Sequence, residues 1–296
     1  MPPQIKNQRT WAGTVCSEAQ YLSLTLPYFA PDNSTPHQDT QYVDGNCYYC
    51  GGVRSFRMDK SLWHPKLGYN FRESLSCSGC ALNARMRAFF HFLTEHGMDL
   101  SGDQVYITEK LTPMFRALVE RYPRMQGSEY FDNVPTGTHH LGAQVEDLMQ
   151  LTFESESFDT VLSFDVLEHV PDYQQAFQEI YRVLRPGGRF IGTFPFDLDL
   201  STTFARAEID AEGEIVHLEE PEYHGNPVGS PSLCFTEFGW DLLAKLRRIG
   251  FSQVSVTLYA DEKSGYYGRE QPIFYMCRPT TPKIARPHNA SQRPTF

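Results

Sequence analysis

Residues 157–196 have the sequence SFDTVLSFDVLEHVPDYQQAFQEIYRVLRPGGRFIGTFPF, and this stretch decides the fold. The apolar run over residues 158–166, with its β-branched members, predicts a strand. Asp172 is a suitable N-cap for a helix, because apolar residues recur at helical spacing after it. Pro186-Gly187-Gly188 ends that helix, and residues 189–196 are extended again. A strand, a crossover helix and a second strand within about forty residues form a βαβ unit, which predicts a mostly parallel sheet.

Polar residues stand where the first strand of this unit ends, namely Asp165, Glu168 and His169. In an open α/β sheet, ligands bind in the crevice outside the carboxyl ends of the strands. We therefore expect a ligand site at this edge of the sheet.

Two motifs carry a resemblance to a known family. SFDVLEHVPD (residues 163–172) and EIYRVLRPGGRFIGTFPF (residues 179–196) resemble the fourth-strand motif and the fifth-strand entry of class I S-adenosylmethionine (SAM)-dependent methyltransferases. The resemblance extends more weakly from about Gln104 to Arg278. It implies an α/β fold with a doubly wound, mostly parallel, seven-stranded sheet and SAM as the methyl donor. The alternative is another doubly wound fold with a nucleotide site.

The rest of the chain divides around this domain. We expect a loosely structured N-terminal arm (residues 1–44), in which residues 17–26 form a short helix or strand against the core. A cysteine module with a connecting helix (45–96), the methyltransferase domain (97–278) and a proline-containing tail (279–296) follow. Regular periodicity disappears over residues 197–234, a segment too long for a simple connection. It is predicted to be an insertion over the active site.

Composition excludes several classes of protein. The 296 residues are 41% hydrophobic and 21% charged, as in a soluble globular protein, and no apolar run is long enough to span a membrane. The N-terminus lacks the apolar core of a signal peptide, so a cytoplasmic location is expected. A net charge of −10 argues against nucleic acid as a partner. Nothing in the sequence indicates an oligomeric state.

Four of the seven cysteines form two Cys-x-x-Cys pairs, Cys47 with Cys50 and Cys77 with Cys80. Two such turns supply four thiolates, which predicts a tetrahedral, structural Zn²⁺ site in a reducing compartment. A redox-active pair of dithiols is the alternative. Residues 45–90 carry seven basic and two acidic side chains. This module either binds an anionic group or packs against the acidic main domain.

The resemblance assigns the methionine end of SAM to the first loop of the domain. Glu109 keeps the family's acidic position at the end of the first strand, but Leu111 and Pro113 replace the glycines that normally follow. The loop still leads to a helix N-terminus, which can receive the SAM carboxylate. Thr112 either adds a hydroxyl to this site or caps the helix.

The resemblance also implies the remaining SAM contacts. Glu129 matches the residue that accepts hydrogen bonds from the ribose hydroxyls. Asp147 matches the acceptor for the adenine amino group, and Leu148 the residue that packs on the ring. For both carboxylates, a solvated surface position is the alternative. Ser163, Phe164 and Asp165 are expected to border the sulfonium.

Methyl transfer is an in-line displacement, so the protein mainly aligns the nucleophile with the methyl group. A base is needed only for a hydroxyl or a protonated amine. His169 and His224 are the candidates, with Asp165 beside them, and hydrogen bonding within a loop is the alternative for each histidine. We expect transfer to oxygen of a small-molecule or glycan acceptor. The alternatives are RNA or protein methylation with the zinc module as reader, and an inactive SAM-fold binding protein, which the missing glycines favour.

Overall fold

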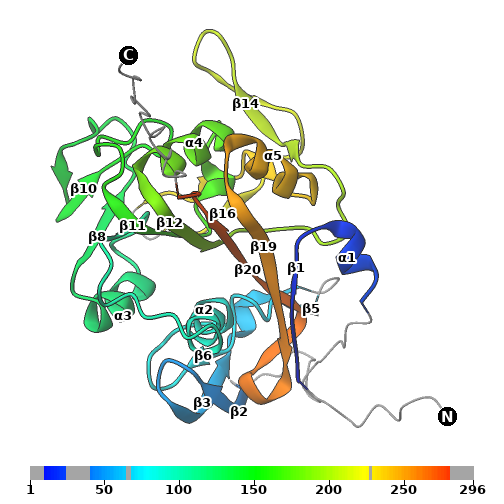
Figure 1. Ribbon diagram of the computed structural model, residues 1–296. Helices are drawn as coiled ribbons and strands as arrows, with labels where there is room; N and C mark the ends of the chain where they lie inside the picture. The colour runs from blue at the N-terminus through cyan, green and yellow to red at the C-terminus, as the bar shows by residue number, and fades with distance from the viewer. Residues whose placement is uncertain (1–9, 25–40, 65–67, 227–228, 281–296) are drawn as a thin grey trace, which may run out of the picture.

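A computed structural model describes residues 10–24, 41–64, 68–226 and 229–280. Its centre is a nine-stranded sheet in the order β1-β19-β20-β12-β11-β7-β8-β10-β9 (Figure 1). In that order the strands are β1 (Thr10–Val15), β19 (Ser252–Asp261), β20 (Tyr266–Cys277), β12 (Leu184–Thr193), β11 (Phe158–Phe164), β7 (Val105–Ile107), β8 (Met125–Glu129), β10 (Ala143–Val145) and β9 (His139–His140).

The five strands from β12 to β10 are parallel, whereas β20 runs antiparallel to both β12 and β19. The predicted βαβ unit is confirmed as β11, α4 (Tyr173–Val183) and β12, and the Asp172 side chain caps α4 by accepting from the Gln175 N–H at 2.9 Å. The doubly wound, mostly parallel sheet is therefore as expected. It carries two further edge strands, β1 and β9, beyond the seven that the resemblance implies.

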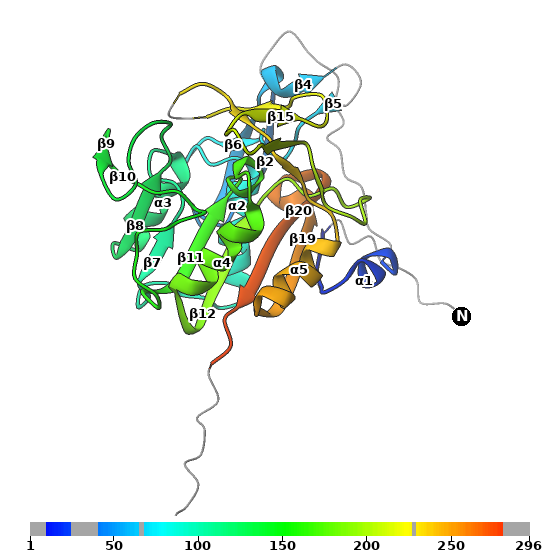
Figure 2. The same ribbon diagram turned by 90° about the horizontal axis from the view of Figure 1, so that it is seen from above.

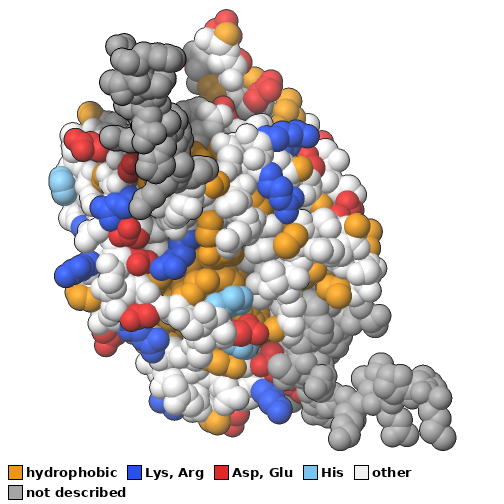
Figure 3. Space-filling model, in the orientation of Figure 1, with side chains coloured by type: hydrophobic (Ala, Val, Ile, Leu, Met, Phe, Trp, Pro, Cys, Tyr) orange, Lys and Arg blue, Asp and Glu red, His pale blue; other side chains and the backbone are white. Residues whose placement is uncertain are grey.

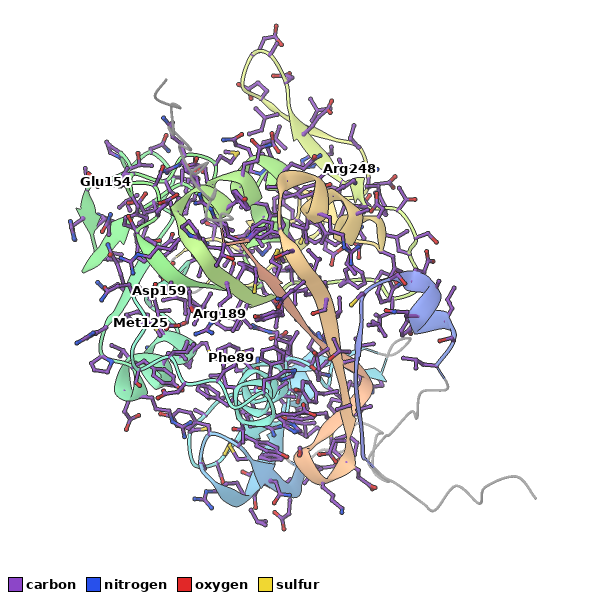
Figure 4. All side chains as sticks on the ribbon, viewed as in Figure 1. Phe89, Met125, Glu154, Asp159, Arg189 and Arg248 are labelled. Atoms are coloured by element: carbon purple, nitrogen blue, oxygen red, sulfur yellow. The ribbon has the colours of Figure 1, made fainter. Side chains whose placement is uncertain are left out.

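Helices cover both faces of the sheet. One core contains apolar side chains of α4 and α5 (Asp241–Ile249), and the other those of α2 (Ala84–Glu95) and α3 (Pro113–Arg121). In the second core the Phe89 ring of α2, labelled in Figure 4, meets the Phe164 ring of β11 edge-on at 4.9 Å. The helix before the domain is thus part of its core.

The expectation of a loose N-terminal arm is wrong for residues 10–15, which form a strand, whereas the short element expected within residues 17–26 is found as a helix. Strand β1 pairs antiparallel with β19, from Thr10 opposite Asp261 to Val15 opposite Val256. Helix α1 (Glu18–Leu22) lies beside α5 (Figure 2), where the Tyr21 and Trp240 rings are 5.0 Å apart. Of the chain before residue 41, residues 1–9 and 25–40 lie outside the described residues, as do residues 281–296 of the expected tail.

The cysteine module is a small sheet that packs against one end of the main sheet (Figure 1). It contains β2 (Gln41–Cys47), β3 (Gly52–Met58) and β6 (Ser76–Cys77), with η1 (Lys60–Leu62), β4 (Trp63–His64) and β5 (Gly68–Tyr69) between β3 and β6. The fully buried Arg87 of α2 joins module to sheet. Its guanidinium lies 3.6 Å from the centre of the Phe56 ring and donates to the carbonyls of Leu75 and Ser264. Ser264 belongs to η3 (Glu262–Ser264), at the tip of the β19–β20 hairpin.

The predicted insertion at residues 197–234 consists of short ribbons. These are β13 (Phe204–Ala205) paired with β18 (Thr236–Glu237), β14 (Ala207–Ile209) with β15 (Ile215–His217), and β16 (Tyr223–His224) with β17 (Ser232–Leu233). The short helix η2 (Leu167–His169) follows β11 and lies beneath the insertion, where the Phe235 N–H donates to the Glu168 carbonyl at 2.8 Å.

We predict that Arg87→Met lowers the free energy of unfolding by about 2–4 kcal/mol, because it leaves two buried carbonyls without their donor. Urea unfolding measures the change. Arg57→Met is the matched control, since the exposed Arg57–Asp59 pair contributes less than about 1 kcal/mol. Equal effects of the two substitutions would contradict the role given to Arg87.

Candidate active site

A cavity of about 1780 Å³ lies along the edge of the sheet where the parallel strands end. Its wall contains residues that follow β7, β8, β10, β11 and β12, together with residues of the insertion. Glu109, Thr112, Glu129, Asp147, Leu148, Phe164, Asp165, His169 and His224 all line it. The structure therefore brings together all but one of the residues predicted for SAM and for the transfer step.

The exception is Ser163, which does not line the cavity. Its side chain is fully buried within the sheet and accepts a hydrogen bond from the Thr108 hydroxyl at 3.0 Å. Successive side chains of a strand point to opposite faces, and β11 is central and covered on both faces. The side chain of Ser163 therefore joins two strands of the sheet, and of the three residues expected at the sulfonium only Phe164 and Asp165 line the cavity.

The loop after β7 packs closely against β8 although it lacks the glycines of the family pattern. The Glu129 carboxylate accepts from the backbone N–H groups of Lys110 and Leu111 at 2.7 and 2.6 Å. A Cβ on Gly127 of β8 would stand 2.6 Å from the Phe115 ring and 2.8 Å from the Glu109 carbonyl oxygen. The loop can therefore lie close to β8 because Gly127 of that strand has no side chain.

Glu109 lies buried beneath this loop, and no hydrogen-bond partner is found for its Oε1 in the part of the chain that the structure describes. Burial raises the pKa of its carboxyl to about 8, and the positive charge of Arg85 opposes that rise. Thr112 caps α3 by accepting from the Phe115 N–H at 3.1 Å. Glu109 and the start of α3 thus offer an acidic group and free N–H groups to one ligand.

Of the two acidic residues after β10, Glu146 already has protein partners. Its carboxylate accepts from the N–H and the hydroxyl of Thr152 at 2.8 and 2.5 Å. Asp147 accepts from the Met149 N–H through Oδ1 at 2.8 Å and is only half-buried. Asp147 is therefore the better placed of the two to accept from a ligand.

Asp165 is held in an ion-pair cluster that sequence reasoning missed. Two oxygens of Asp165 accept from Arg72 at 2.5 and 2.6 Å, and Arg85 Nε lies 3.0 Å away. Glu73 pairs with both arginines, at 2.5 and 2.9 Å. Burial opposes ionisation, but the adjacent Arg72 and Arg85 hold the pKa of Asp165 well below its usual range. Asp165 is a permanent anion that joins the cysteine module to β11, which makes it a poor base.

The contacts of three basic residues distinguish the two roles predicted for the positive charge of the cysteine module, namely binding of an external anion and packing against the main domain. Arg85 and Arg87 are buried, and Arg72 faces Asp165 of the main domain. These three groups support packing against the main domain rather than binding of an external anion. The only sequence signal for the cluster was the charge imbalance itself.

His169 and His224 come together from distant segments, with ring centres 5.2 Å apart. Both lie next to Cys234, whose Sγ is 4.0 Å from His169 Nδ1 and 3.3 Å from His224 Nε2. The sequence analysis placed both histidines at the site, but Cys234 lies outside the two Cys-x-x-Cys pairs and has no nearby cysteine or histidine at a metal-binding spacing.

The four paired cysteines converge as predicted. Sγ atoms of Cys47 and Cys80, and of Cys50 and Cys77, are 3.8 Å apart, and all four atoms lie within 4.8 Å of one another. The two turns have the same form. The N–H of Gly51 donates to the Cys47 carbonyl and the N–H of Ala81 donates to the Cys77 carbonyl, and both Gly51 and Ala81 have a left-handed φ, of 70° and 61°. Four thiolates in this arrangement fit a tetrahedral, structural Zn²⁺.

Comparison with known proteins shows what this domain is similar to. Residues 77–192 match the family described as a methyltransferase domain. The chain is 30% identical over 112 residues to sterol 24-C-methyltransferase of Aspergillus fumigatus, covering 38% of this chain and 25% of that protein. It is 48% identical over 48 residues to arsenite methyltransferase of Mus musculus, covering 16% and 13%. The chain spans about a quarter or less of the length of these relatives.

A solved structure of 1,6-didemethyltoxoflavin-N1-methyltransferase from Burkholderia thailandensis, with bound S-adenosylhomocysteine, is 17% identical with a TM-score of 0.41. The match covers 66% of this chain and 79% of that one. The strand order and the two motifs agree with this family match, and together they support a class I SAM-dependent methyltransferase domain in this chain. No helix among the described residues is long and apolar enough to cross a membrane.

We predict that a strong chelator lowers the thermal midpoint of the protein by more than about 10 °C, because a structural metal contributes directly to folding. Cys80→Ser is expected to start from a lower midpoint and to respond less to the chelator. Cys16→Ser is the matched control, since Cys16 is exposed and outside the cluster. A chelator-insensitive wild type would contradict the structural metal.

Proposed function

We propose that this protein transfers the methyl group of SAM to oxygen of a small-molecule or glycan acceptor. The charge of the cavity is the main support. Its described lining contains twelve carboxylates and two guanidinium groups, and both guanidinium groups are paired with Asp165 and Glu73. SAM carries a sulfonium and an ammonium, so a cavity lined by negative charge attracts and concentrates it.

Each part of SAM has a matching group in this arrangement. Glu129 offers acceptors to the ribose hydroxyls, and Asp147 offers one to the adenine amino group beside Leu148. Glu109 and the N-terminus of α3 take the ammonium and the carboxylate of the methionine end. The cavity, at about 1780 Å³, exceeds the roughly 300–1,000 Å³ of a single ligand pocket, which leaves room for an acceptor.

In the transfer step, a lone pair of the acceptor oxygen attacks the methyl carbon in line with the carbon–sulfur bond. That bond breaks, its electron pair stays on sulfur, and S-adenosylhomocysteine is released. The acceptor hydroxyl loses its proton, and His169 and His224 are the cavity groups placed to assist this loss. Asp165 contributes by fixing the end of β11 through Arg72 and Arg85.

A small acceptor is favoured over RNA. The relatives are named as methyltransferases of sterol and of arsenite, which are small acceptors. In the cysteine module, Arg85 and Arg87 are buried and unable to contact a phosphate backbone. On the face shown in Figure 3, positive and negative side chains are interspersed, without a continuous basic surface.

We predict that the metal-loaded protein binds SAM in calorimetry, and that Glu129→Gln weakens the affinity at least tenfold. Glutamine still accepts from the loop but loses an acceptor for the ribose diol. Glu154→Gln is the matched control, because Glu154 is exposed and lies outside the cavity lining (Figure 4). Absence of SAM binding by the wild type would overturn the proposed function.

We also predict that SAM binding at pH 7 releases a proton. In the free protein Glu109 is largely protonated at pH 7, because its pKa is about 8. The SAM ammonium favours the ionised carboxylate, so its pKa falls on binding and the proton leaves. Calorimetry in buffers of different ionisation enthalpy measures this release. Glu109→Gln should abolish it, and an unchanged release in that variant would show that the proton comes from another group.

A further inference from the structure

Four side chains that commonly bind metals converge where the insertion crosses the end of β11. The ligand atoms of His169, His224 and Cys234 lie within 4.8 Å of one another. Glu168 lies beside this group, with its Oε1 3.5 Å from His169 Nε2 and 3.7 Å from His224 Nδ1. We propose that these residues form a second Zn²⁺ site, separate from the four paired cysteines.

The state of Glu168 is the first independent support. Its side chain is only 1% exposed, and neither carboxylate oxygen has a hydrogen-bond partner among the described residues. A buried carboxylate without hydrogen bonds is strongly unfavourable unless a cation compensates its charge. A metal between Glu168 and the two imidazole rings supplies that cation.

The second support is that one ring nitrogen of each histidine, the one farther from Glu168, already has a protein hydrogen-bond partner. His169 Nδ1 lies 2.9 Å from the Leu233 carbonyl oxygen. Because a carbonyl only accepts, Nδ1 carries the proton and Nε2, which faces Glu168, has the free lone pair.

His224 follows the same pattern. Its Nε2 lies 3.1 Å from Glu222 Oε1, and its Nδ1 lies 3.7 Å from Glu168 Oε1. The Cys234 Sγ is near both ring nitrogens, at 3.3 Å from Nε2 and 3.4 Å from Nδ1. A histidine that donates one ring N–H to a carbonyl or carboxylate and turns the other nitrogen inward is typical of metal ligands.

The backbone holds the two contributing segments together. The N–H of Phe235 donates to the Glu168 carbonyl, and the N–H of Cys234 donates to the Glu222 carbonyl, both at 2.8 Å. The first bond ties the end of the insertion to η2, and the second joins two segments of the insertion, so the backbone brings the ligand atoms close together.

The donor set indicates the metal and its use. Two imidazoles, a thiolate and a carboxylate suit Zn²⁺, which also accepts a further ligand in catalytic sites. Glu168, His169 and His224 line the transfer cavity, so an acceptor hydroxyl there can reach the metal. With a metal bound, His169 and His224 would assist the loss of the acceptor proton as metal ligands and not as free bases. The metal would lower the pKa of a bound acceptor hydroxyl, and the proton would leave to solvent. This use of the site rests on the proposed function, whereas metal binding itself does not.

The test is the zinc content of the purified, zinc-loaded protein after extensive dialysis, measured by elemental analysis. We expect about two equivalents per chain in the wild type and about one in His224→Ala. His217→Ala is the matched control, because His217 is exposed in the same insertion and outside the cluster, and it should keep two equivalents. Cys234→Ser provides a second loss variant, and circular dichroism checks that each variant is folded.

One equivalent in the wild type, or two in both folded loss variants, would overturn the second zinc site. Calorimetry with SAM on the same samples keeps this result apart from the proposed function. Loss of SAM binding with two equivalents of zinc would sink the function and leave the metal site standing. SAM binding with one equivalent of zinc would exclude the second zinc site and leave the proposed function standing.

Discussion

The contact of Asp165 with Arg72 and Arg85 is the interaction on which the rest of the site depends. Asp165 lies at the point where β11 ends, with a left-handed φ of 53°, and its N–H and carboxylate are both tied to Thr193 of β12. The two guanidinium groups come from the cysteine module and from α2. One carboxylate thus fixes the strand end, turns the chain into η2, and attaches the module to the cavity wall.

The cysteine module and α2 place two guanidinium groups at the cavity, but both groups are already paired with carboxylates of the protein. Arg72, Glu73 and Arg85 line the cavity, but they neutralise one another and Asp165. The module therefore contributes shape and rigidity to the cavity while leaving its negative charge almost unopposed. A metal held by the four paired cysteines would stabilise the site from a distance, without meeting the ligand.

The sequence was most informative where the determining interactions are local. The βαβ unit, its Asp172 cap and the two cysteine pairs were predictable, because periodicity, capping and ligand spacing act over a few residues. The parts that were missed depend on distant partners. Asp165 and Arg72 are 93 residues apart, and Cys234 meets His169 65 residues away. Among residues 12–15 of β1, whose side chains the structure describes, only Val15 is well buried, and the strand is positioned by backbone pairing with β19.

The pairing of Arg87 with Ser264 has a consequence for how the chain is made. These residues are 177 positions apart, and the cysteine module leaves the ribosome long before the β19–β20 hairpin that completes its interface. Until that hairpin arrives, Arg87 lacks one of its carbonyl acceptors and the edge of the sheet is open. Contacts of such long sequence separation slow folding and favour partly folded states. During synthesis, the cysteine module is therefore present before the β19–β20 hairpin that completes its interface. The partly folded chain is exposed to aggregation at this stage.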